Sequence, residues 1–116
     1  MAKRKKQRNR QKAPTFDYVD PDGNMLTLRQ SLSTATIAKI GEPPTGDAAS
    51  LEDAWRRRSE ALFERLAVRW EIAGAPIERQ RELLERFRVA SPAERAWVRE
   101  ALREHCAENF PDVQAP

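Results

Sequence analysis

The segment Thr-Phe-Asp-Tyr-Val-Asp-Pro-Asp-Gly-Asn-Met-Leu-Thr-Leu-Arg, residues 15–29, carries the clearest structural signal in this chain. Its central part, Asp20–Asn24, combines a proline that presets φ with Asp, Gly and Asn residues that tolerate left-handed backbone geometry. Apolar residues alternate with other residues on both sides of this turn: Phe16, Tyr18, Leu26 and Leu28. The pattern predicts a β-hairpin over residues 15–29 with one apolar face. Because an isolated hairpin is only marginally stable, we expect that face to pack against helices.

Four helices are predicted after the hairpin, at about residues 33–40, 51–73, 77–89 and 92–108. Apolar residues at spacings of seven, four, four and three form one stripe along the longest of them: Trp55, Leu62, Leu66, Trp70 and Ala73. Gly74 and Pro76 are expected to end this helix. The last helix opens with a capping box, in which Ser91 and Glu94 flank a proline at the first helical position.

These elements predict an α+β fold that is mostly helical, with the N-terminal β-hairpin packed on a bundle of three to four helices. At 116 residues, the chain has room for a single small domain, which we predict over residues 15–110. A loop with two adjacent prolines, Pro43 and Pro44, joins the hairpin and the first short helix to the helical half. We expect a disordered basic arm over residues 1–14 and a disordered tail over residues 111–116.

Charge is distributed unevenly along the chain. Seven of the 21 lysines and arginines lie in the first 13 residues, which contain no acid: Lys3, Arg4, Lys5, Lys6, Arg8, Arg10 and Lys12. From Pro14 onward the other 14 meet 18 Asp and Glu residues, so the folded part is expected to be mildly acidic. Because the arm has no aromatic residue to stack on bases, any contact that it makes with nucleic acid is predicted to be salt-sensitive and independent of base sequence.

We find no residue pattern that predicts catalysis, a cofactor or a metal ion. The Asp20–Asn24 segment begins like a calcium-binding loop, but Met25 replaces the glycine that such a loop requires next. His105 and Cys106 are neighbours, so on a helix their side chains point about 100° apart and do not bind one metal ion together. We interpret His105 as a group that suits the C-terminal end of a helix, and Cys106 as a buried thiol. The sequence therefore predicts a protein that is not an enzyme.

Three consecutive arginines, Arg56–Arg58, form the most basic segment of the folded part. On a helix these side chains fan around the axis, and Glu52 and Asp53 lie four residues before the first two of them. This spacing favours a solvated, salt-bridged helix face over an anion-binding site.

The remaining observations favour a non-catalytic protein-binding adaptor or assembly chaperone. Apolar residues of the hairpin and the long helix are the candidates for holding a helical segment of a partner: Phe16, Tyr18, Leu26, Leu28, Trp55, Phe63 and Trp70. The alternative is a small nucleic-acid-associated protein that is tethered by its basic arm. An adaptor should expose an apolar patch larger than roughly a few hundred Å². A nucleic-acid protein should instead place Arg57, Arg65 and Arg69 on the same side as the arm.

A single cysteine and the lack of a long apolar segment predict a cytoplasmic protein that makes no contact with a membrane. The basic start is followed by Pro14 and a polar run instead of the apolar stretch of a signal peptide. The sequence leaves the oligomeric state and the identity of the partner open.

The order of these segments resembles the small tail assembly chaperones of long-tailed bacteriophages. The resemblance rests on the basic start, the hairpin around Asp22 and Gly23, the Leu-Ser-Thr-Ala-Thr-Ile run at 32–37 and the Ala-Glu-Arg-Ala-Trp-Val-Arg-Glu-Ala run at 93–101. It implies an all-helical body after the hairpin, and a protein that coats the tape-measure protein and recruits tail-tube subunits without catalysis. It also implies that the hairpin face and the long helix hold the partners.

Overall fold

The computed structural model describes residues 14–40 and 48–113, which form a four-stranded antiparallel sheet and four helices. In chain order the elements are β1 (Thr15–Val19), β2 (Met25–Arg29), α2 (Thr34–Ile40), α3 (Ala48–Leu66), β3 (Ala67–Ile72), β4 (Ala75–Ile77), α4 (Gln80–Arg88) and α5 (Pro92–Asn109). The α+β class is as predicted, and α2 and α5 lie close to the predicted bounds. The sheet, however, has two more strands than the predicted hairpin. Residues 1–13, which include the basic arm, lie outside the described residues.

The first hairpin forms where the sequence predicts it. β1 pairs with β2 in a regular antiparallel register from Thr15 opposite Arg29 to Val19 opposite Met25. In the turn, the Asp20 carboxylate accepts hydrogen bonds from the backbone N–H groups of Asp22 (2.8 Å) and Asn24 (2.9 Å). Gly23 has a φ of 86°, which only glycine adopts without strain. The carboxylate that began the calcium-like pattern therefore holds the turn together.

The predicted helix 51–73 is wrong in its last part, because α3 ends at Leu66 and the chain continues as β3. Val68, Trp70 and Ile72 are β-branched or aromatic residues at alternate positions, so this segment also fits a strand. β2 has a second edge whose N–H and C=O groups need partners, and β3 supplies them, with Trp70 opposite Leu26. This long-range pairing outweighs the local helical periodicity.

A second hairpin replaces the predicted helix stop at Gly74. Ala73 (φ 53°) and Gly74 (φ 81°) are the two central residues of the turn from β3 to β4, and both have the positive φ of a tight hairpin turn. The amide oxygen of Asn24 accepts a hydrogen bond of 3.0 Å from the Ala73 N–H, so the two turns are joined. The predicted helix 77–89 starts later for the same reason, since Ile77 pairs with Trp70 and α4 begins at Gln80.

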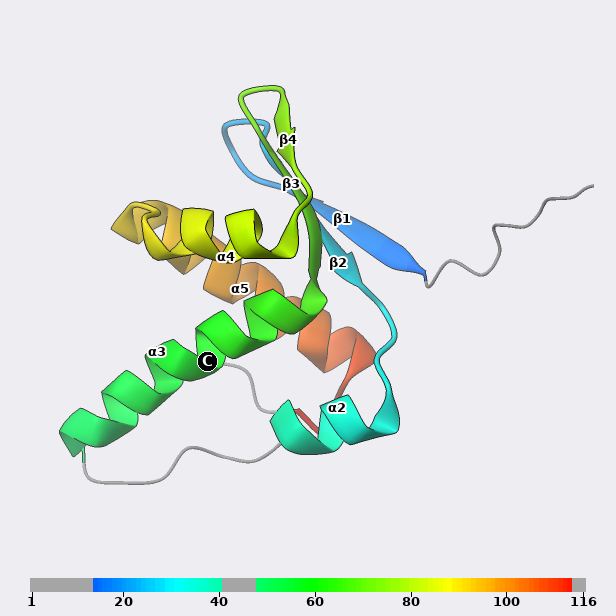
Figure 1. The fold of residues 1–116 in the computed structure, drawn as a ribbon, viewed down its shortest axis with the longest axis vertical. Coiled ribbons are helices and arrows are strands. Elements are labelled where there is room, and N and C mark those ends of the chain that lie inside the picture. The colour runs from blue at the N-terminus through cyan, green and yellow to red at the C-terminus, as the bar shows by residue number, and fades with distance from the viewer. Residues whose placement is uncertain (1–13, 41–47, 114–116) are drawn as a thin grey trace, which may run out of the picture.

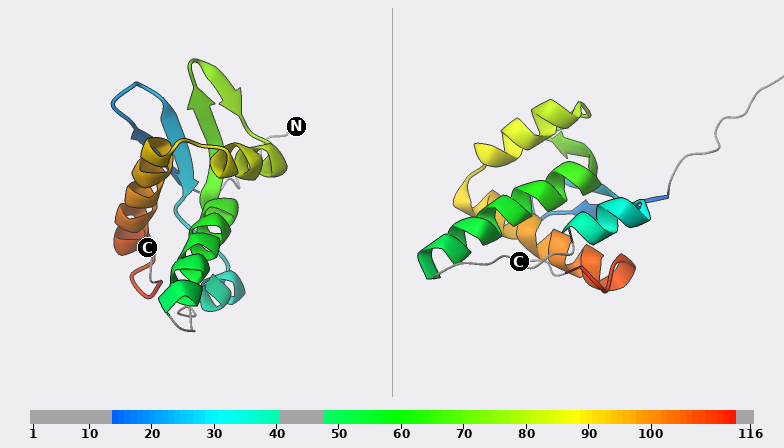
Figure 2. Two further views of the ribbon diagram at one scale, coloured as in Figure 1. Left: turned by 90° about the vertical axis from the view of Figure 1, so that its left-hand side faces the viewer. Right: turned by 60° about the horizontal axis from the view of Figure 1, so that its bottom comes forward.

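The two hairpins stand side by side in one sheet, with α4 and α5 beside them and α2 and α3 at the other end of the molecule (Figure 1). The left view of Figure 2 shows α5 along the first hairpin and α4 beside the second. The predicted hairpin on a helical bundle is therefore replaced by a larger sheet that shares its core with the helices. No helix in the described ranges has both the length and the apolar character that a membrane crossing requires.

The core lies between the inner face of the sheet and helices α3, α4 and α5. Phe63 of α3 is fully buried, stacks on Phe87 of α4 at 4.7 Å between ring centroids, and meets Trp70 of β3 edge-on at 5.6 Å. Val113, after α5, is only 6% exposed and belongs to the same cluster. The prediction of disorder from residue 111 is therefore wrong for residues 111–113, and residues 114–116 lie outside the described ranges.

Candidate anion-binding groove

Most of the residues predicted to hold a partner belong to the core. Leu26, Leu28 and Phe63 are 0% exposed and Trp70 is 2% exposed, so these four side chains are already covered by other residues of the same chain. In a domain this small, the apolar faces of the hairpin and of the long helix must cover each other. Their assignment to partner binding is therefore wrong for this conformation. Accessible surface remains on the other three: Phe16, Tyr18 and Trp55.

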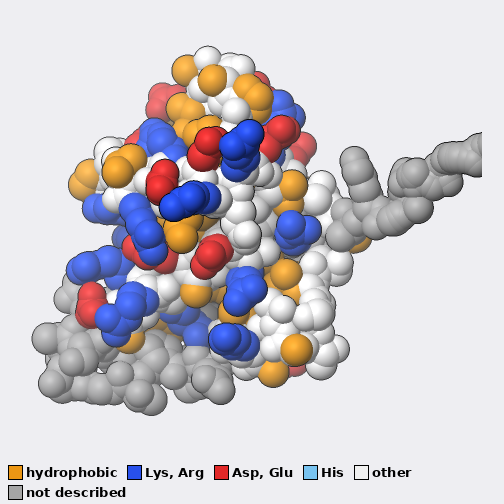
Figure 3. Space-filling model, in the orientation of Figure 1, with side chains coloured by type: hydrophobic (Ala, Val, Ile, Leu, Met, Phe, Trp, Pro, Cys, Tyr) orange, Lys and Arg blue, Asp and Glu red, His pale blue; other side chains and the backbone are white. Residues whose placement is uncertain are grey.

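The large exposed hydrophobic residues in the described part of the chain are Phe16, Val19 and Val89. The first two lie on β1, whereas Val89 follows α4. The large hydrophobic residues that are exposed in the described part of the chain thus lie in two separate places, whereas the adaptor hypothesis predicted a contiguous apolar patch. Lys and Arg side chains are prominent instead, and they gather over α3 and α4 on the face shown in Figure 3.

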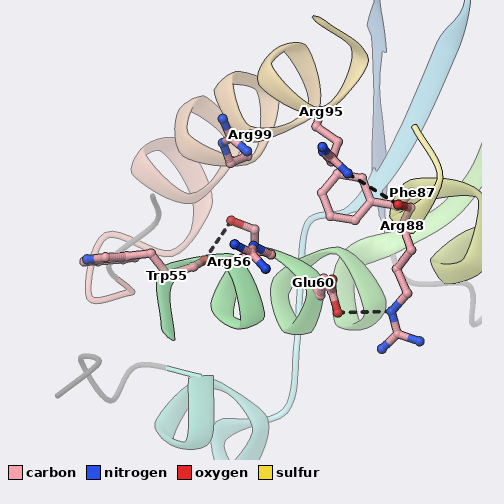
Figure 4. Close-up of a pocket in the computed structure, with 8 residues that line it drawn as sticks. Trp55, Arg56, Glu60, Phe87, Arg88, Arg95 and Arg99 are labelled. Carbon is pink, nitrogen blue, oxygen red and sulfur yellow. Dashed lines mark hydrogen bonds and ion pairs between the residues drawn. The ribbon is translucent and has the colours of Figure 1, made fainter. Parts of the chain in front are cut away.

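A groove of about 430 Å³ lies between α3, α4 and α5, and we call it the arginine groove. Of the eight residues that line it, four are arginines and one is a carboxylate. They are Trp55, Arg56, Ser59 and Glu60 of α3, Phe87 and Arg88 of α4, and Arg95 and Arg99 of α5. Figure 4 shows Arg95 reaching from α5 toward Phe87 and Arg88, and Arg99 beside the α5 ribbon, with Trp55 at one end of the groove and the Glu60–Arg88 ion pair at the other.

Helical spacing places these side chains on facing surfaces. Arg95 and Arg99 are four residues apart and therefore lie on one face of α5, as Arg56 and Glu60 do on α3. The start of α5 is fixed by a complete capping box, in which the Ser91 hydroxyl accepts the Glu94 N–H (3.1 Å) and the Glu94 carboxylate accepts the Ser91 N–H (2.9 Å).

Glu94 also ties α5 to α4. Its carboxylate accepts a hydrogen bond of 2.7 Å from the guanidinium of Arg86. This bond, together with the Ser91 N–H bond, lowers the pKa of Glu94 below its usual value. Because Glu94 lies one residue before Arg95, the bond to α4 also fixes the wall of the groove that carries Arg95 and Arg99.

The arginines of the groove have few acidic partners. Arg88 pairs with Glu60 at 3.1 Å, and Arg56 lies 3.5 Å from Asp53. Arg95 donates a weak hydrogen bond of 3.4 Å to the backbone carbonyl of Arg88. The described residues provide no carboxylate to either Arg95 or Arg99 within ion-pair distance. The groove therefore holds an excess of positive charge although the folded part of the chain is acidic.

Apolar and aromatic surface completes the groove. Phe87 is 3% exposed, so its ring forms part of the core behind the groove. Trp55 is partly exposed, and the guanidinium of Arg58 lies 5.8 Å from the centroid of its ring. The Ser59 hydroxyl donates a hydrogen bond of 3.0 Å to the Trp55 carbonyl within α3. A ligand in the groove would thus meet both cations and one edge of aromatic surface.

The predicted salt-bridged face around Arg56–Arg58 is confirmed in part. Asp53 pairs with both Arg57 (2.6 Å) and Arg56 (3.5 Å). The sequence interpretation missed that Arg56 also faces arginines of α4 and α5 across the groove. The spacing of Arg95 and Arg99 was a usable signal for a basic face on α5, but the meeting of three helices has no local signature.

His105 belongs to α5 but lies away from the groove, and its fully buried side chain points toward the first hairpin. Its Nε2–H donates a hydrogen bond of 2.6 Å to the Arg29 carbonyl, and its Nδ1 accepts one of 2.9 Å from the Tyr18 hydroxyl. The interpretation of His105 as a helix-end group is therefore wrong, because α5 continues to Asn109. Burial lowers the pKa of His105, although its bond to the Arg29 carbonyl opposes the shift.

Cys106 is buried, as predicted, and burial raises the pKa of its thiol to about 11. A thiol with such a pKa stays protonated and is a poor nucleophile near neutral pH. Within the described residues, no three His, Cys, Asp or Glu side chains are placed to hold a metal ion together.

The structure describes only some of the residues that the nucleic-acid alternative predicts to bind. The arm residues Lys3, Arg4, Lys5, Lys6, Arg8, Arg10 and Lys12 lie outside the described residues. Arg57 and Arg65 are exposed on α3, whereas Arg69 lies on the sheet and pairs with Glu71 (3.0 Å). Arg69 thus belongs to a different part of the fold from Arg57 and Arg65.

Comparisons with known proteins find no family model, no curated protein and no solved structure that matches this chain.

Proposed function

We propose that this protein is a non-catalytic binding module, an adaptor, that holds an acidic segment of a partner protein in the arginine groove. The observation that carries the proposal is the convergence of four arginines from three helices around a single lining carboxylate, Glu60. Like charges that face each other raise the free energy of the free protein, and an acidic ligand would relieve this repulsion.

The residue types of the groove suit a protein ligand. The planar guanidinium of arginine binds carboxylates through two parallel hydrogen bonds, which gives geometric selectivity as well as affinity. Arginine and tryptophan are also the residues that most often dominate binding at protein interfaces. Trp55 offers part of its ring at the end of the groove, where an apolar side chain of the partner would pack.

Two features favour an acidic peptide over a nucleic acid. Glu60 lies inside the groove and Asp53 lies beside it, so a continuous line of phosphates would meet carboxylates. From Pro14 onward, acids also outnumber bases, which disfavours a long polyanion. The basic arm keeps the nucleic-acid function as the second candidate, and the experiment below separates the two.

The assembly-chaperone role implied by the resemblance to phage tail chaperones is a special case of this proposal. In that case the acidic segment would belong to a tape-measure protein and the adaptor would act in the cytoplasm. The hairpin β3–β4 departs from the all-helical body that the resemblance implies.

Charge reversal on α5 tests the proposal. We expect Arg99→Glu to weaken binding of a glutamate-rich helical peptide at least about tenfold, because it removes a charge-assisted hydrogen bond and adds repulsion. Arg81→Glu is the matched control, since its side chain is 90% exposed on α4 and does not line the groove. Both variants change the net charge equally, so a contribution from the basic arm is the same in each.

Affinities measured by isothermal calorimetry for the two variants decide the matter. Equal losses for Arg99→Glu and Arg81→Glu would show that only net charge matters and would overturn the groove as the site. If an oligonucleotide of equal charge binds more tightly than the peptide, and only Arg99→Glu weakens it, the nucleic-acid function replaces the adaptor.

A further inference from the structure

The sheet ends in two strands that each have one neighbour among the described residues, β1 and β4. β4 has three residues with Pro76 in the middle, and proline blocks the addition of another strand. β1 has five residues, none of them proline or lysine, and it pairs with β2 without a bulge. Of the features that protect the edge strands of natural proteins, β1 therefore has no proline, lysine or bulge, and Asp17 is its one charged residue.

The hydrogen bonds of the first hairpin fix which backbone groups of β1 point outward. The Asp20 N–H bonds to the Asn24 carbonyl (2.9 Å), and the Gln30 N–H bonds to the Pro14 carbonyl (2.8 Å). Because bonded pairs alternate along an antiparallel ladder, the backbone groups of Phe16 and Tyr18 face β2. The N–H and C=O groups of three exposed residues therefore face away from the sheet: Thr15, Asp17 and Val19.

Exposed apolar side chains lie on the same strand. Phe16 is 51% exposed and Val19 is 63% exposed, so β1 carries two of the three large exposed hydrophobic residues in the described part of the chain. The Phe16 ring touches the Tyr18 ring edge-on at 5.1 Å and is on the inner side of the sheet with it. An added strand would cover both the free backbone groups and this ring.

We propose that β1 pairs antiparallel with β1 of a second copy of this chain, which joins two sheets into one across a two-fold axis. In such a pair, outward-facing residues must lie opposite outward-facing residues, and the interface uses the same surface on both copies. This condition allows only a few registers, and the side chains of β1 distinguish among them.

The favoured register places Phe16 opposite Phe16 of the second copy. This register brings the two Phe16 rings close together. It also puts the Thr15 hydroxyl of each copy opposite the Asp17 carboxylate of the other copy, on either side of the two-fold axis. The register centred on Asp17 would place two carboxylates opposite each other, which is destabilising. The register centred on Tyr18 would instead leave Phe16 opposite Asp20. The strand is thus self-complementary in one register.

The added interface is small, because only three of the five β1 residues, Thr15, Phe16 and Asp17, lie opposite β1 of the second copy in this register. Interfaces that bury less than roughly 1,200 Å² belong to weak, reversible complexes. We therefore expect a dimer whose population rises with protein concentration, with a dissociation constant on the order of micromolar.

Sedimentation equilibrium of the full chain over a concentration series tests the dimer. Asp17→Pro removes one outward-facing N–H and leaves the bonds between β1 and β2 in place, so this variant should remain a monomer. Asp17→Ala removes the same carboxylate and keeps the N–H, so it should still dimerise, although more weakly than the wild type because the contact with Thr15 is lost. Val89→Ser removes an exposed apolar residue elsewhere and should also dimerise. Circular dichroism verifies that each variant is folded.

Cross-linking tests the register. Phe16→Cys should form a covalent dimer on oxidation, whereas Thr15→Cys should not, because residue 15 faces Asp17 of the second copy. The native thiol, Cys106, is buried and does not compete. A wild type that stays monomeric at every concentration overturns the proposal, as does equal dimerisation of Asp17→Pro and Asp17→Ala. Cross-linking through Thr15→Cys in preference to Phe16→Cys overturns the register.

Discussion

His105 connects α5 to both strands of the first hairpin through its two ring nitrogens. A backbone carbonyl only accepts hydrogen bonds, so Nε2 must carry the proton that bonds to Arg29, and Nδ1 is left as the acceptor for the Tyr18 hydroxyl. The neutral ring therefore satisfies both neighbours. A second proton on Nδ1 would remove this acceptor and create a buried cation that has no carboxylate partner among the described residues.

The burial of His105 predicts a loss of stability in mild acid. Because the folded-state pKa of His105 is lowered, the unfolded chain binds more protons, and stability present above about pH 6.5 is lost as the pH falls below that value. Urea unfolding between pH 7.5 and 5.5 should show this loss for the wild type. His105→Gln, which keeps a donor and an acceptor but does not titrate, should show a flatter profile. Equal slopes for the two proteins would contradict this prediction.

That pH range avoids the titration of Glu94. The lowered pKa of Glu94 means that its contribution is present above about pH 4.5 and is lost only as the pH falls below that value. At the scale of single residues, the sequence predicted the burial of Cys106 correctly. It gave no sign of the contacts of His105, whose partners are 87 and 76 positions away in the chain.

The strand β3 shows how far an element can be predicted from its own residues. Its apolar residues fit the helical stripe of α3 as well as a strand, so the local pattern is ambiguous. The choice between helix and strand is decided by β2, whose second edge needs a hydrogen-bonding partner. β2 precedes β3 by about 40 residues, so this requirement cannot be seen in the local sequence. The first hairpin and α5, by contrast, have unambiguous turn and capping signals and were predicted correctly.

The turn between β3 and β4 predicts a stabilising substitution. Ala73 has a φ of 53°, a left-handed conformation that strains most residues with a Cβ but that Asn tolerates better. Asn-Gly is also the preferred pair for such a turn. We expect Ala73→Asn to raise the free energy of unfolding by about 0.5–1 kcal/mol. Ala35→Asn is a control at an exposed position of α2 and should be neutral or slightly destabilising. A lower thermal midpoint for Ala73→Asn than for the wild type would show that the turn is not strained.

At the scale of the whole molecule, the charge pattern predicts how the chain meets nucleic acids. If the seven charges of the arm engage phosphates, the logarithm of the affinity should fall with the logarithm of the salt concentration with a slope of about −6. Binding should be weak near physiological salt, where screening acts over about 8 Å, and should be the same for two unrelated oligonucleotides. A variant without residues 1–13 should lose most of it.

Fluorescence anisotropy of labelled oligonucleotides across a salt series measures this binding. Sub-micromolar, sequence-selective binding at physiological salt would favour the nucleic-acid function over the adaptor. The division into a basic arm and an acidic body rests on composition alone and stays a prediction, because residues 1–13 lie outside the described residues. Composition did not predict the arginine groove, since Arg56, Arg88, Arg95 and Arg99 come together only when three helices pack.

The pairing of β2 with β3 also sets the order in which the protein can complete its fold during synthesis. About 40 residues separate the first hairpin from Ala67–Ile72, so at a synthesis rate of roughly 5–20 residues per second the hairpin leaves the ribosome several seconds before β3 does. Throughout that interval, Leu26 and Leu28 have no core to enter and β2 has an open edge. During this interval the nascent chain therefore exposes apolar side chains and an unpaired strand edge that the folded protein buries. The risk of aggregation is highest between the synthesis of its two hairpins.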